Sequence, residues 1–356
     1  MLKSLSFTDY TLAELTGIFR EKNFPAYRAE QAAGWVYKKL VFSPGKMTDL
    51  PPDVKAFLSD NLHVTGSIIE RVFESKLDST VKFLVKLADG NYIETVFMAE
   101  SGGKSAVCIS TQAGCPIKCA FCVSGRNGLK RNLTVGEIAE QILHVNAHCR
   151  DNASSHNVKE SQSRPVRNIV IMGMGEPLLN TDNLLKALEI ITAKWGLGMG
   201  LNRITLSTAI CPREQLDKLV KSKLVPNLAV SLHAADDNLR KKLVPHCKAD
   251  IAEIVRNAKW YRSATGKELT FEYVLLRDVN SSAKDAGNLA RLLKRCNVKV
   301  NLIVFNAVKD SEFSPPPEKD VLKFQDVLIR AGIMTFIRQS RGQDISAACG
   351  QLTSSE

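Results

Sequence analysis

The segment RNIVIMGMGEPLLNTDNLLKALEIITAK, residues 167–194, contains the pattern of one β-strand followed by one α-helix. Residues 167–173 form a short run rich in Ile and Val, which is typical of a strand buried on both faces. After the loop GMGEP, apolar residues recur at three- and four-residue spacing over 183–194, which predicts an amphipathic helix. The segment therefore predicts a βα unit of the kind found in parallel sheets.

The same unit repeats along the second part of the chain. Buried strands are predicted over residues 105–110, 167–173, 203–207, 227–232, 269–276 and 299–305. The helices that follow them are predicted over residues 134–148, 183–194, 213–221, 251–264, 283–296 and 319–332. Six such units predict an α/β fold, a partial (β/α)6 barrel related to the TIM barrel, and a doubly wound open sheet is the alternative.

The first hundred residues follow a different pattern. Apolar spacing predicts short helices up to about residue 65, and two alternating apolar runs then flank Asp89-Gly90, a strong hairpin signal. We therefore expect a small accessory domain of helices and a β-hairpin (1–100), the barrel (101–340) and a C-terminal segment (341–356). Residues 150–168 are polar and lack periodicity, which predicts a surface insertion.

Composition and charge limit the functional class. The chain is 44% hydrophobic and 24% charged, which is the ordinary globular range. It has no apolar run of membrane-spanning length and no apolar secretion signal, so we expect a cytoplasmic protein without membrane contact. The net charge is +11, and residues 1–100 hold 12 Lys and Arg against 13 Asp and Glu, so the excess lies beyond residue 100. A basic surface attracts nucleic acid, although solubility alone explains the charge equally well.

The stretch CPIKCAFC, residues 115–122, places Cys115, Cys119 and Cys122 in one loop after the first predicted barrel strand. Zinc sites usually combine C-x2-C with a distant second pair, and this chain has no second C-x2-C. Iron–sulfur clusters also use four thiolates as a rule. A three-thiolate cluster would leave one iron open for a small molecule. Three unrelated buried cysteines are the alternative interpretation.

Other candidate residues follow the predicted strands at their carboxyl ends, where barrels of this type hold their working residues. The glycines of GMGEP allow a ligand to approach the backbone closely, and Glu176 can pair with an ammonium group. Ser207 and Asn306 offer hydrogen bonds. Taken singly, GMGEP is equally an ordinary turn, Ser207 a local cap and His233 a packed side chain.

The spacing C-x3-C-x-F-C after the first strand of a six-unit barrel resembles the radical S-adenosylmethionine (SAM) superfamily. Further segments resemble the RlmN/Cfr family of adenosine methyltransferases that act on RNA: FPAYRAEQ (24–31), GMGEPLLN (173–180), SLHA (231–234), NLIVFN (301–306) and DISAACGQL (344–352). The resemblance covers nearly the whole chain, in family order. It implies one [4Fe–4S] cluster held by Cys115, Cys119 and Cys122, with SAM bound at the open iron.

The resemblance also implies roles for individual residues. It assigns contacts with SAM to Gly175, Glu176, Ser207, Ser231, Leu232, His233 and Asn306. Cys349 is expected to carry the methyl group as S-methylcysteine, and Cys108 to form a transient disulfide with Cys349. Glu94 is expected to accept a proton, although the sequence alone allows a solvent-facing strand residue equally well.

The implied reaction is methylation of adenine carbon 2, in large-subunit rRNA and in the anticodon loop of tRNA. RNA, a reductant such as a flavodoxin system, an accessory domain of RNA-binding type and a monomeric state are implied with it. The alternatives are a Cfr-like enzyme that modifies carbon 8, a non-catalytic RNA-binding factor and a zinc protein. Residues 207–212, STAICP, lack the glycine of the family's STSG pattern, so we expect a different backbone path after Ser207.

Overall fold

The computed structural model describes residues 6–99, 103–152, 166–308 and 310–353. Its main element is a ten-stranded sheet with the order β1-β2-β3-β4-β7-β8-β9-β10-β11-β12. The strands of this sheet are β1 (Ser67–Glu74), β2 (Thr80–Leu87), β3 (Tyr92–Ala99), β4 (Ser105–Cys108), β7 (Asn168–Ile171), β8 (Ile204–Thr208), β9 (Asn227–Ser231), β10 (Leu269–Leu275), β11 (Lys299–Val304) and β12 (Met334–Arg338). A separate hairpin is formed by β5 (Gln112–Gly114) and β6 (Leu129–Asn132).

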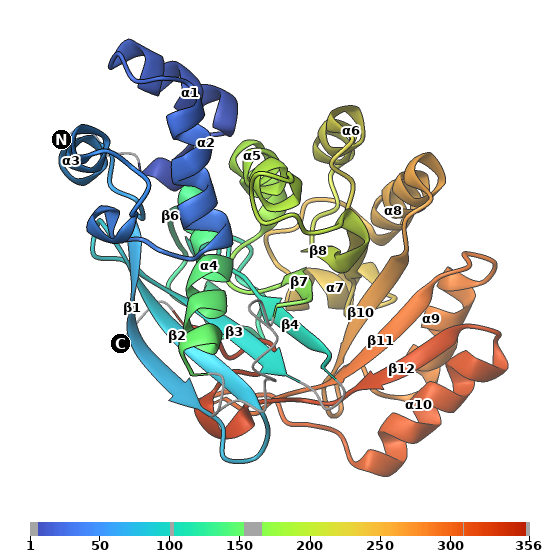
Figure 1. Ribbon diagram of the computed structural model, residues 1–356. Coiled ribbons are helices and arrows are strands. Elements are labelled where there is room, and N and C mark those ends of the chain that lie inside the picture. The colour runs from blue at the N-terminus through green and yellow to red at the C-terminus, as the bar shows by residue number, and fades with distance from the viewer. Residues whose placement is uncertain (1–5, 100–102, 153–165, 309, 354–356) are drawn as a thin grey trace.

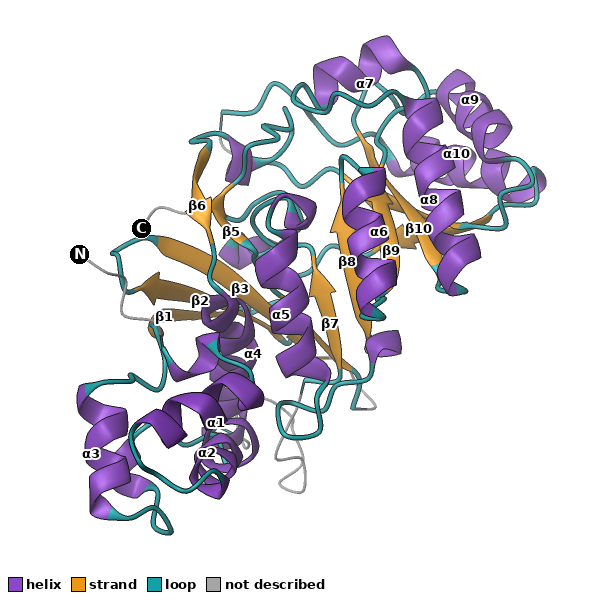
Figure 2. Cartoon of the chain, turned by 90° about the horizontal axis from the view of Figure 1, so that it is seen from above, coloured by secondary structure: helices purple, strands orange, loops and turns teal. Residues whose placement is uncertain are grey.

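The helices lie mainly on the outer side of this curved sheet (Figure 1). They are α1 (Leu12–Glu21), α2 (Tyr27–Ala33), α3 (Pro52–Asp60), α4 (Val135–Asp151), α5 (Thr181–Thr192), α6 (Arg213–Ser222), α7 (Asp237–Leu243), α8 (Ile251–Thr265), α9 (Ala283–Leu293) and α10 (Glu318–Arg330). Figure 2 shows α1, α2 and α3 together at one end, next to α4. Among the described residues, no helix combines the length and the apolar character needed to cross a bilayer.

Strands β4 and β7 to β12 are parallel and follow one another in sequence order. A doubly wound sheet reverses its strand order and carries helices on both faces. Here the order runs in one direction, and α5, α6, α8, α9 and α10 line the outer face (Figure 1). The prediction of a partial barrel is therefore confirmed. Strand β12 adds a seventh parallel strand that the sequence pattern did not predict.

The predicted hairpin around Asp89-Gly90 is confirmed as β2 and β3, and Gly90 has the positive φ of +83° that favours glycine in such a turn. Strand β3 also pairs antiparallel with β4, so the hairpin and β1 extend the barrel sheet rather than forming a sheet of their own. Of the insertion predicted over 150–168, residues 153–165 lie outside the described part of the chain.

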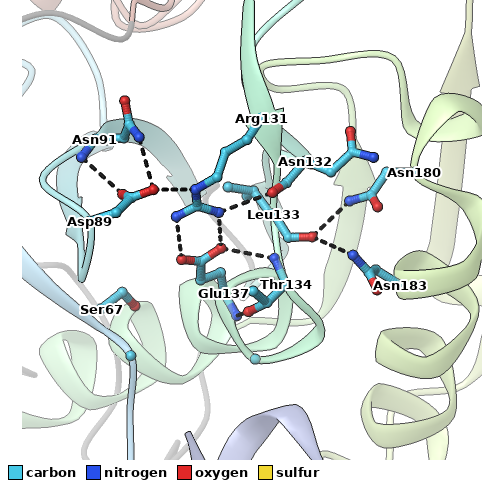
Figure 3. A network of polar contacts seen from close by, with 12 residues as sticks. Ser67, Asp89, Asn91, Arg131, Asn132, Leu133, Thr134, Glu137, Asn180 and Asn183 are labelled. Atoms are coloured by element: carbon cyan, nitrogen blue, oxygen red, sulfur yellow. Dashed lines mark hydrogen bonds and ion pairs between the residues drawn. The ribbon is translucent and has the colours of Figure 1, made fainter. Parts of the chain in front are cut away.

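One charged network fastens the hairpin turn to the barrel (Figure 3). Arg131 on β6 donates two hydrogen bonds of 2.7 Å to the carboxylate of Glu137 on α4, and a third to Asp89 in the β2–β3 turn. This paired geometry is the strong, bidentate form of an Arg–carboxylate contact. Asn180 and Asn183 each donate to the carbonyl oxygen of Leu133 at 2.9 Å. The network fixes the end of β6, which closes the loop that contains the three clustered cysteines.

A second network buries a carboxylate where the N-terminal segment contacts helix α4. Glu140 is fully buried and accepts hydrogen bonds from the backbone N–H of Gly66 at 2.8 Å, from Ser6 at 3.3 Å and from the hydroxyls of Thr8 and Ser67. Burial raises the pKa of Glu140 to about 7, and the negative charge of Asp9 adds to this, against the lowering effect of the hydrogen bonds. The N-terminal segment is therefore attached through a carboxyl group that titrates near neutrality.

The substitution Glu140→Gln should change the pH dependence of stability. Between the ordinary carboxyl pKa near 4.5 and the folded value near 7, the unfolded chain releases a proton that the folded chain keeps. The free energy of unfolding of the wild type therefore falls as pH rises through this window, by about 2–3 kcal/mol between pH 5 and 8 from this group. Urea unfolding at pH 5 and at pH 8 measures this. The difference in free energy of unfolding between Glu140→Gln and the wild type should shift by that amount in favour of the variant at pH 8. Parallel pH profiles of the two proteins would contradict the prediction.

Candidate active site

A cavity of about 680 Å³ lies inside the barrel, between the strand ends, the C-terminal segment and the loop of residues 115–128 between β5 and β6, called the cysteine loop below. Eleven of the predicted site residues line it: Cys108, Cys115, Cys119, Cys122, Gly175, Glu176, Ser207, Ser231, His233, Asn306 and Cys349. The two other predicted residues, Glu94 and Leu232, are not on its wall. The fold thus brings together residues that are separated by up to 241 positions in sequence, because parallel strands direct their carboxyl ends to one rim.

The cysteine loop is held at several points along the backbone. Cys115 N–H donates to the carbonyl of Gly128 at 3.2 Å, and Ala120 N–H donates to that of Leu243, the last residue of α7, at 2.9 Å. Gly114, with φ +78°, lies so close to Gly128 that an added Cβ would be 2.0 Å from its carbonyl oxygen. Only glycine therefore fits immediately before this loop.

Each clustered thiol has a raised pKa, and burial is the main cause. The pKa of Cys115 is about 12, and that of Cys119 is raised well above the ordinary value, partly because Cys122 and Cys115 are nearby. Thiolates at this position therefore require a cation beside them. In the described residues, no group of His, Cys, Asp and Glu side chains has the spacing of a single-ion site. The chain has no second C-x2-C, so the donor set of three thiols suits a cluster with one open iron better than a closed four-ligand zinc site.

The GMGEP loop packs against the chain itself. A Cβ on Gly173 would lie 2.7 Å from the Ser110 hydroxyl, and one on Gly175, with φ +103°, would lie 2.6 Å from Gln112. The glycines are thus required by close packing on the segment after β4, in addition to any approach of a ligand.

Glu176 joins this loop to the end of β8. Its two carboxylate oxygens accept from the backbone N–H groups of Leu178 at 3.2 Å and Ala209 at 2.8 Å. Burial raises the pKa of Glu176 to about 7, although these bonds and the charge of Arg240 oppose the increase. Pairing of Glu176 with an ammonium group stays a prediction.

The ends of β8 and β9 place polar groups on the cavity wall. The hydroxyls of Ser207 and Ser231 are 3.3 Å apart. His233 adopts a left-handed φ of +62°, its Nδ1 accepts from Val274 N–H at 3.1 Å, and its ring contacts Phe121 with 4.8 Å between centroids. Burial and the charge of Arg240 lower the pKa of His233 to about 3, so the ring is neutral. It packs beside the cysteine loop as well as facing the cavity.

The sequence pattern did not reveal Arg240 on α7, whose side chain is 3% exposed. It donates to the carbonyl oxygens of Ala209 at 2.6 Å, Leu232 at 3.1 Å and Ser231 at 3.2 Å. Among the described residues, no carboxylate lies within ion-pair distance of it. The guanidinium therefore links the ends of β8 and β9 through hydrogen bonds. One of these bonds is to Ala209 in the segment STAICP (207–212), in which Cys211 adopts φ +46°.

We expect Arg240→Met to destabilise the protein by about 3–5 kcal/mol, because three carbonyl groups at the ends of β8 and β9 lose the guanidinium as a donor. Lys241→Met, on an exposed position of the same helix, should stay within about 0.5 kcal/mol of the wild type. Urea unfolding of both variants measures the difference. Equal stability of the two variants would show that the hydrogen bonds of Arg240 contribute nothing to the free energy of unfolding.

Cys349 lies in a C-terminal segment that is hydrogen-bonded to the cysteine loop and to the segment that follows β11. Gly350 carbonyl accepts from Val123 N–H at 2.8 Å, and Asn306 Nδ2 donates to the Cys349 carbonyl at 3.2 Å. Its thiol is exposed to the cavity, and Cys108 lines the same space. Burial, and then the proximity of Cys349, raise the pKa of Cys108 to about 12. Both thiols are free, so the structure contains no disulfide between them.

Glu94 on β3 is buried and forms an ion pair with Lys82 on β2 at 2.7 Å. Its other oxygen accepts from Thr353 N–H at 2.8 Å. Burial raises the pKa of Glu94, and the charge of Lys82 opposes this. Because the carboxylate faces Lys82 and the C-terminal backbone rather than the cavity, its role as proton acceptor stays a prediction.

Comparison with known proteins agrees with this arrangement. Residues 109–293 match the model of the Radical SAM superfamily. The chain is 41% identical over 346 residues to "Probable dual-specificity RNA methyltransferase RlmN" of Clostridium botulinum, covering 97% of this chain and 95% of the relative. It is 40% identical over 364 residues to "Dual-specificity RNA methyltransferase RlmN" of Aliarcobacter butzleri, covering 99% and 97%. The chain belongs to the RlmN family.

A solved structure supports the same assignment. The crystal structure of a radical SAM methyltransferase from Sphaerobacter thermophilus matches with a TM-score of 0.92 at 37% identity, over 99% of this chain and 100% of that one. As a member of the RlmN family within the radical SAM superfamily, the protein is a radical SAM methyltransferase that uses a [4Fe–4S] cluster and SAM. The three thiols of the cysteine loop and the polar rim beside them fit these groups.

Proposed function

We propose that this protein methylates carbon 2 of an adenosine in large-subunit rRNA and of an adenosine in the tRNA anticodon loop, with Cys349 as the methyl carrier. The observation that carries the proposal is the position of Cys349, whose free thiol is exposed to the cavity that Cys108 and the cysteine loop also line. The relatives' names support RNA as the substrate and a dual specificity. The excess of positive charge beyond residue 100 suits phosphate contacts.

The site residues divide the work as follows. Cys115, Cys119 and Cys122 would hold the cluster, and the rim residues Gly175, Glu176, Ser207, Ser231, Leu232, His233 and Asn306 would surround SAM. When bound, these groups supply the methyl group and the one-electron chemistry that an electron-poor ring carbon requires. Asn306 has a further part, because its amide fixes the Cys349 carbonyl and so positions the carrier.

Cys349 and Cys108 perform the sulfur chemistry. Burial raises the pKa of the Cys349 thiol, the charge of Arg338 on the cavity wall partly offsets this rise, and the charge of Glu272 adds to it. The thiol has to lose its proton before it can accept a methyl group, because the thiolate is the nucleophile. In the release step, Cys108 sulfur attacks Cys349 sulfur, so an S–S bond forms and the S–C bond to RNA breaks. The electron pair of the broken bond stays with the methylene carbon of the RNA product, which takes up one proton, equal to the one the Cys108 thiol loses, and so becomes the methyl group. The resulting disulfide would need a reductant before the next turnover.

Anaerobic turnover of cluster-loaded protein with SAM, a reductant such as a flavodoxin system and fragments of large-subunit rRNA or whole tRNA tests the proposal. Mass mapping of the product should place the methyl group on carbon 2 of adenine. A methyl group on carbon 8 would instead identify a Cfr-like enzyme. Absence of any RNA methylation, with the cluster intact, would contradict the proposal.

We also propose a cytoplasmic location and a monomeric state for the protein. Sedimentation of the purified protein checks the monomeric state.

A further inference from the structure

Two acidic side chains line the cavity, and they differ in how their oxygens are used. Both oxygens of Glu176 accept backbone hydrogen bonds, as described above. Glu272 on β10 is 6% exposed, and its Oε1 accepts from Asn301 Nδ2 at 2.8 Å. Among the described residues, no donor contacts Oε2 of Glu272. One carboxylate oxygen of this largely buried residue is therefore left on the cavity wall for a ligand.

The strand explains why this carboxylate faces inward. Side chains alternate along β10, and Tyr273 packs outward against Phe324 of α10, with 5.2 Å between ring centroids. Glu272 consequently points to the opposite side, into the barrel. In the parallel register it lies beside Ser231 on β9 and Asn301 on β11, so polar side chains cross three neighbouring strands at one level of the barrel.

No basic side chain of the described residues lies within ion-pair distance of Glu272. Arg338 also lines the cavity, but it lies two residues further toward the carboxyl ends of the strands. In the sheet register, Phe336 is level with Asn301, whereas Arg338 is level with Ile303. Burial of a carboxylate with a single protein donor is costly unless a further donor completes its shell. Both charged groups line the 680 Å³ cavity, so the missing donor is expected on a molecule bound there.

We propose that Glu272 accepts a hydrogen bond from a ribose hydroxyl of a nucleoside held in the cavity. A carboxylate from the protein is a known partner of ribose hydroxyls in nucleotide-binding folds. The volume of about 680 Å³ suits one ligand of nucleoside size. The ribose belongs either to SAM, which is an adenosine derivative, or to the target nucleotide of RNA. The inference rests on the SAM- and RNA-binding parts of the proposed function, and its test measures binding rather than turnover.

The variant Glu272→Gln is well matched to this test. Its amide oxygen can keep the bond from Asn301, and its NH2 group then occupies the position of Oε2, so an acceptor is replaced by a donor of equal size. The affinity of cluster-loaded protein for SAM is measured by calorimetry under anaerobic conditions, together with the affinities for 2′-deoxy and 3′-deoxy SAM analogues. If SAM provides the ribose, Glu272→Gln weakens SAM binding at least about tenfold. One deoxy analogue should then bind the wild type and the variant equally well.

A second arm measures binding of an rRNA fragment that carries either ribose or 2′-deoxyribose at the target adenosine. If RNA provides the hydroxyl, SAM affinity stays the same, and the deoxy substitution weakens binding to the wild type but not to Glu272→Gln. The inference is overturned when the variant changes neither affinity by more than about twofold. It is also overturned when every deoxy substitution costs as much in the variant as in the wild type.

Glu268→Gln serves as the matched control. Glu268 immediately precedes β10, and its exposed carboxylate pairs with Lys299 at 2.7 Å on the surface. This variant should bind SAM and RNA as the wild type does, which separates a ribose contact from a general loss of negative charge. Weaker SAM binding by Glu272→Gln, found together with no RNA methylation by the wild type, would refute the proposed function and leave this inference standing.

Discussion

Replacement of Cys349 by alanine is expected to lower RNA methylation by about 10³-fold or more, because the sulfur that carries the methyl group is lost. The cluster and SAM binding should remain, since Cys349 is not among the three thiols of the cysteine loop. Anaerobic turnover with labelled SAM measures methylation, and the iron–sulfur absorbance and iron content measure the cluster.

Cys296→Ala provides the control, because Cys296 is buried away from the cavity and should keep full activity. Methylation by the Cys349→Ala protein at a rate near that of the wild type would show that another group carries the methyl. Loss of the cluster together with activity would instead assign Cys349 a structural role.

The second large effect is expected for Cys108→Ala. Without the thiol that attacks Cys349 sulfur, the thioether between protein and RNA cannot be opened by disulfide formation. Covalent protein–RNA complex should accumulate and appear as a slow band on a denaturing gel, in proportion to the enzyme present. The wild type should show little of this band after the same reaction.

Cys149→Ala is the appropriate control, since Cys149 is buried in α4 and does not line the cavity. The adduct should survive thiol reductants but disappear in the double variant that also lacks Cys349. A Cys108→Ala protein that turns over repeatedly without adduct would exclude Cys108 as the resolving thiol.

The sequence predicted most of the barrel because each buried parallel strand is a continuous apolar run that stands out from its helix. Strand β12 has only five residues, MTFIR, and alternates between exposed and buried positions, so it lacks that signal. Strand β1 was missed for a related reason, because only its first residue is buried. Helix α7 is short and has three basic residues in its last turn. One of its two buried positions is itself basic, so the helix lacks the apolar spacing that indicates an amphipathic helix.

For the site, spacing and strand-end position identified the cysteines and the polar rim. They could not identify Arg240 or Glu272, because the partners of both are backbone or side-chain groups from other strands. A charged residue between aromatic residues in FEY (271–273) is the one local signal that could have indicated Glu272. The contact of Glu94 with Lys82 depends on the β2–β3 register, which the hairpin signal alone does not provide.

The attachment of the C-terminal segment has a kinetic consequence. Hydrogen bonds hold it on both sides of Cys349. The Ser75 hydroxyl and the Lys76 N–H donate to Asp344, and the Val123 N–H donates to the carbonyl of Gly350. A sulfur fixed in this way cannot travel between two separate sites, so the methyl donor and the RNA base have to reach it in turn within one cavity. With Cys349 as the proposed carrier, such a shared space would make the two substrates mutually exclusive at its sulfur, and it predicts a ping-pong order of reaction.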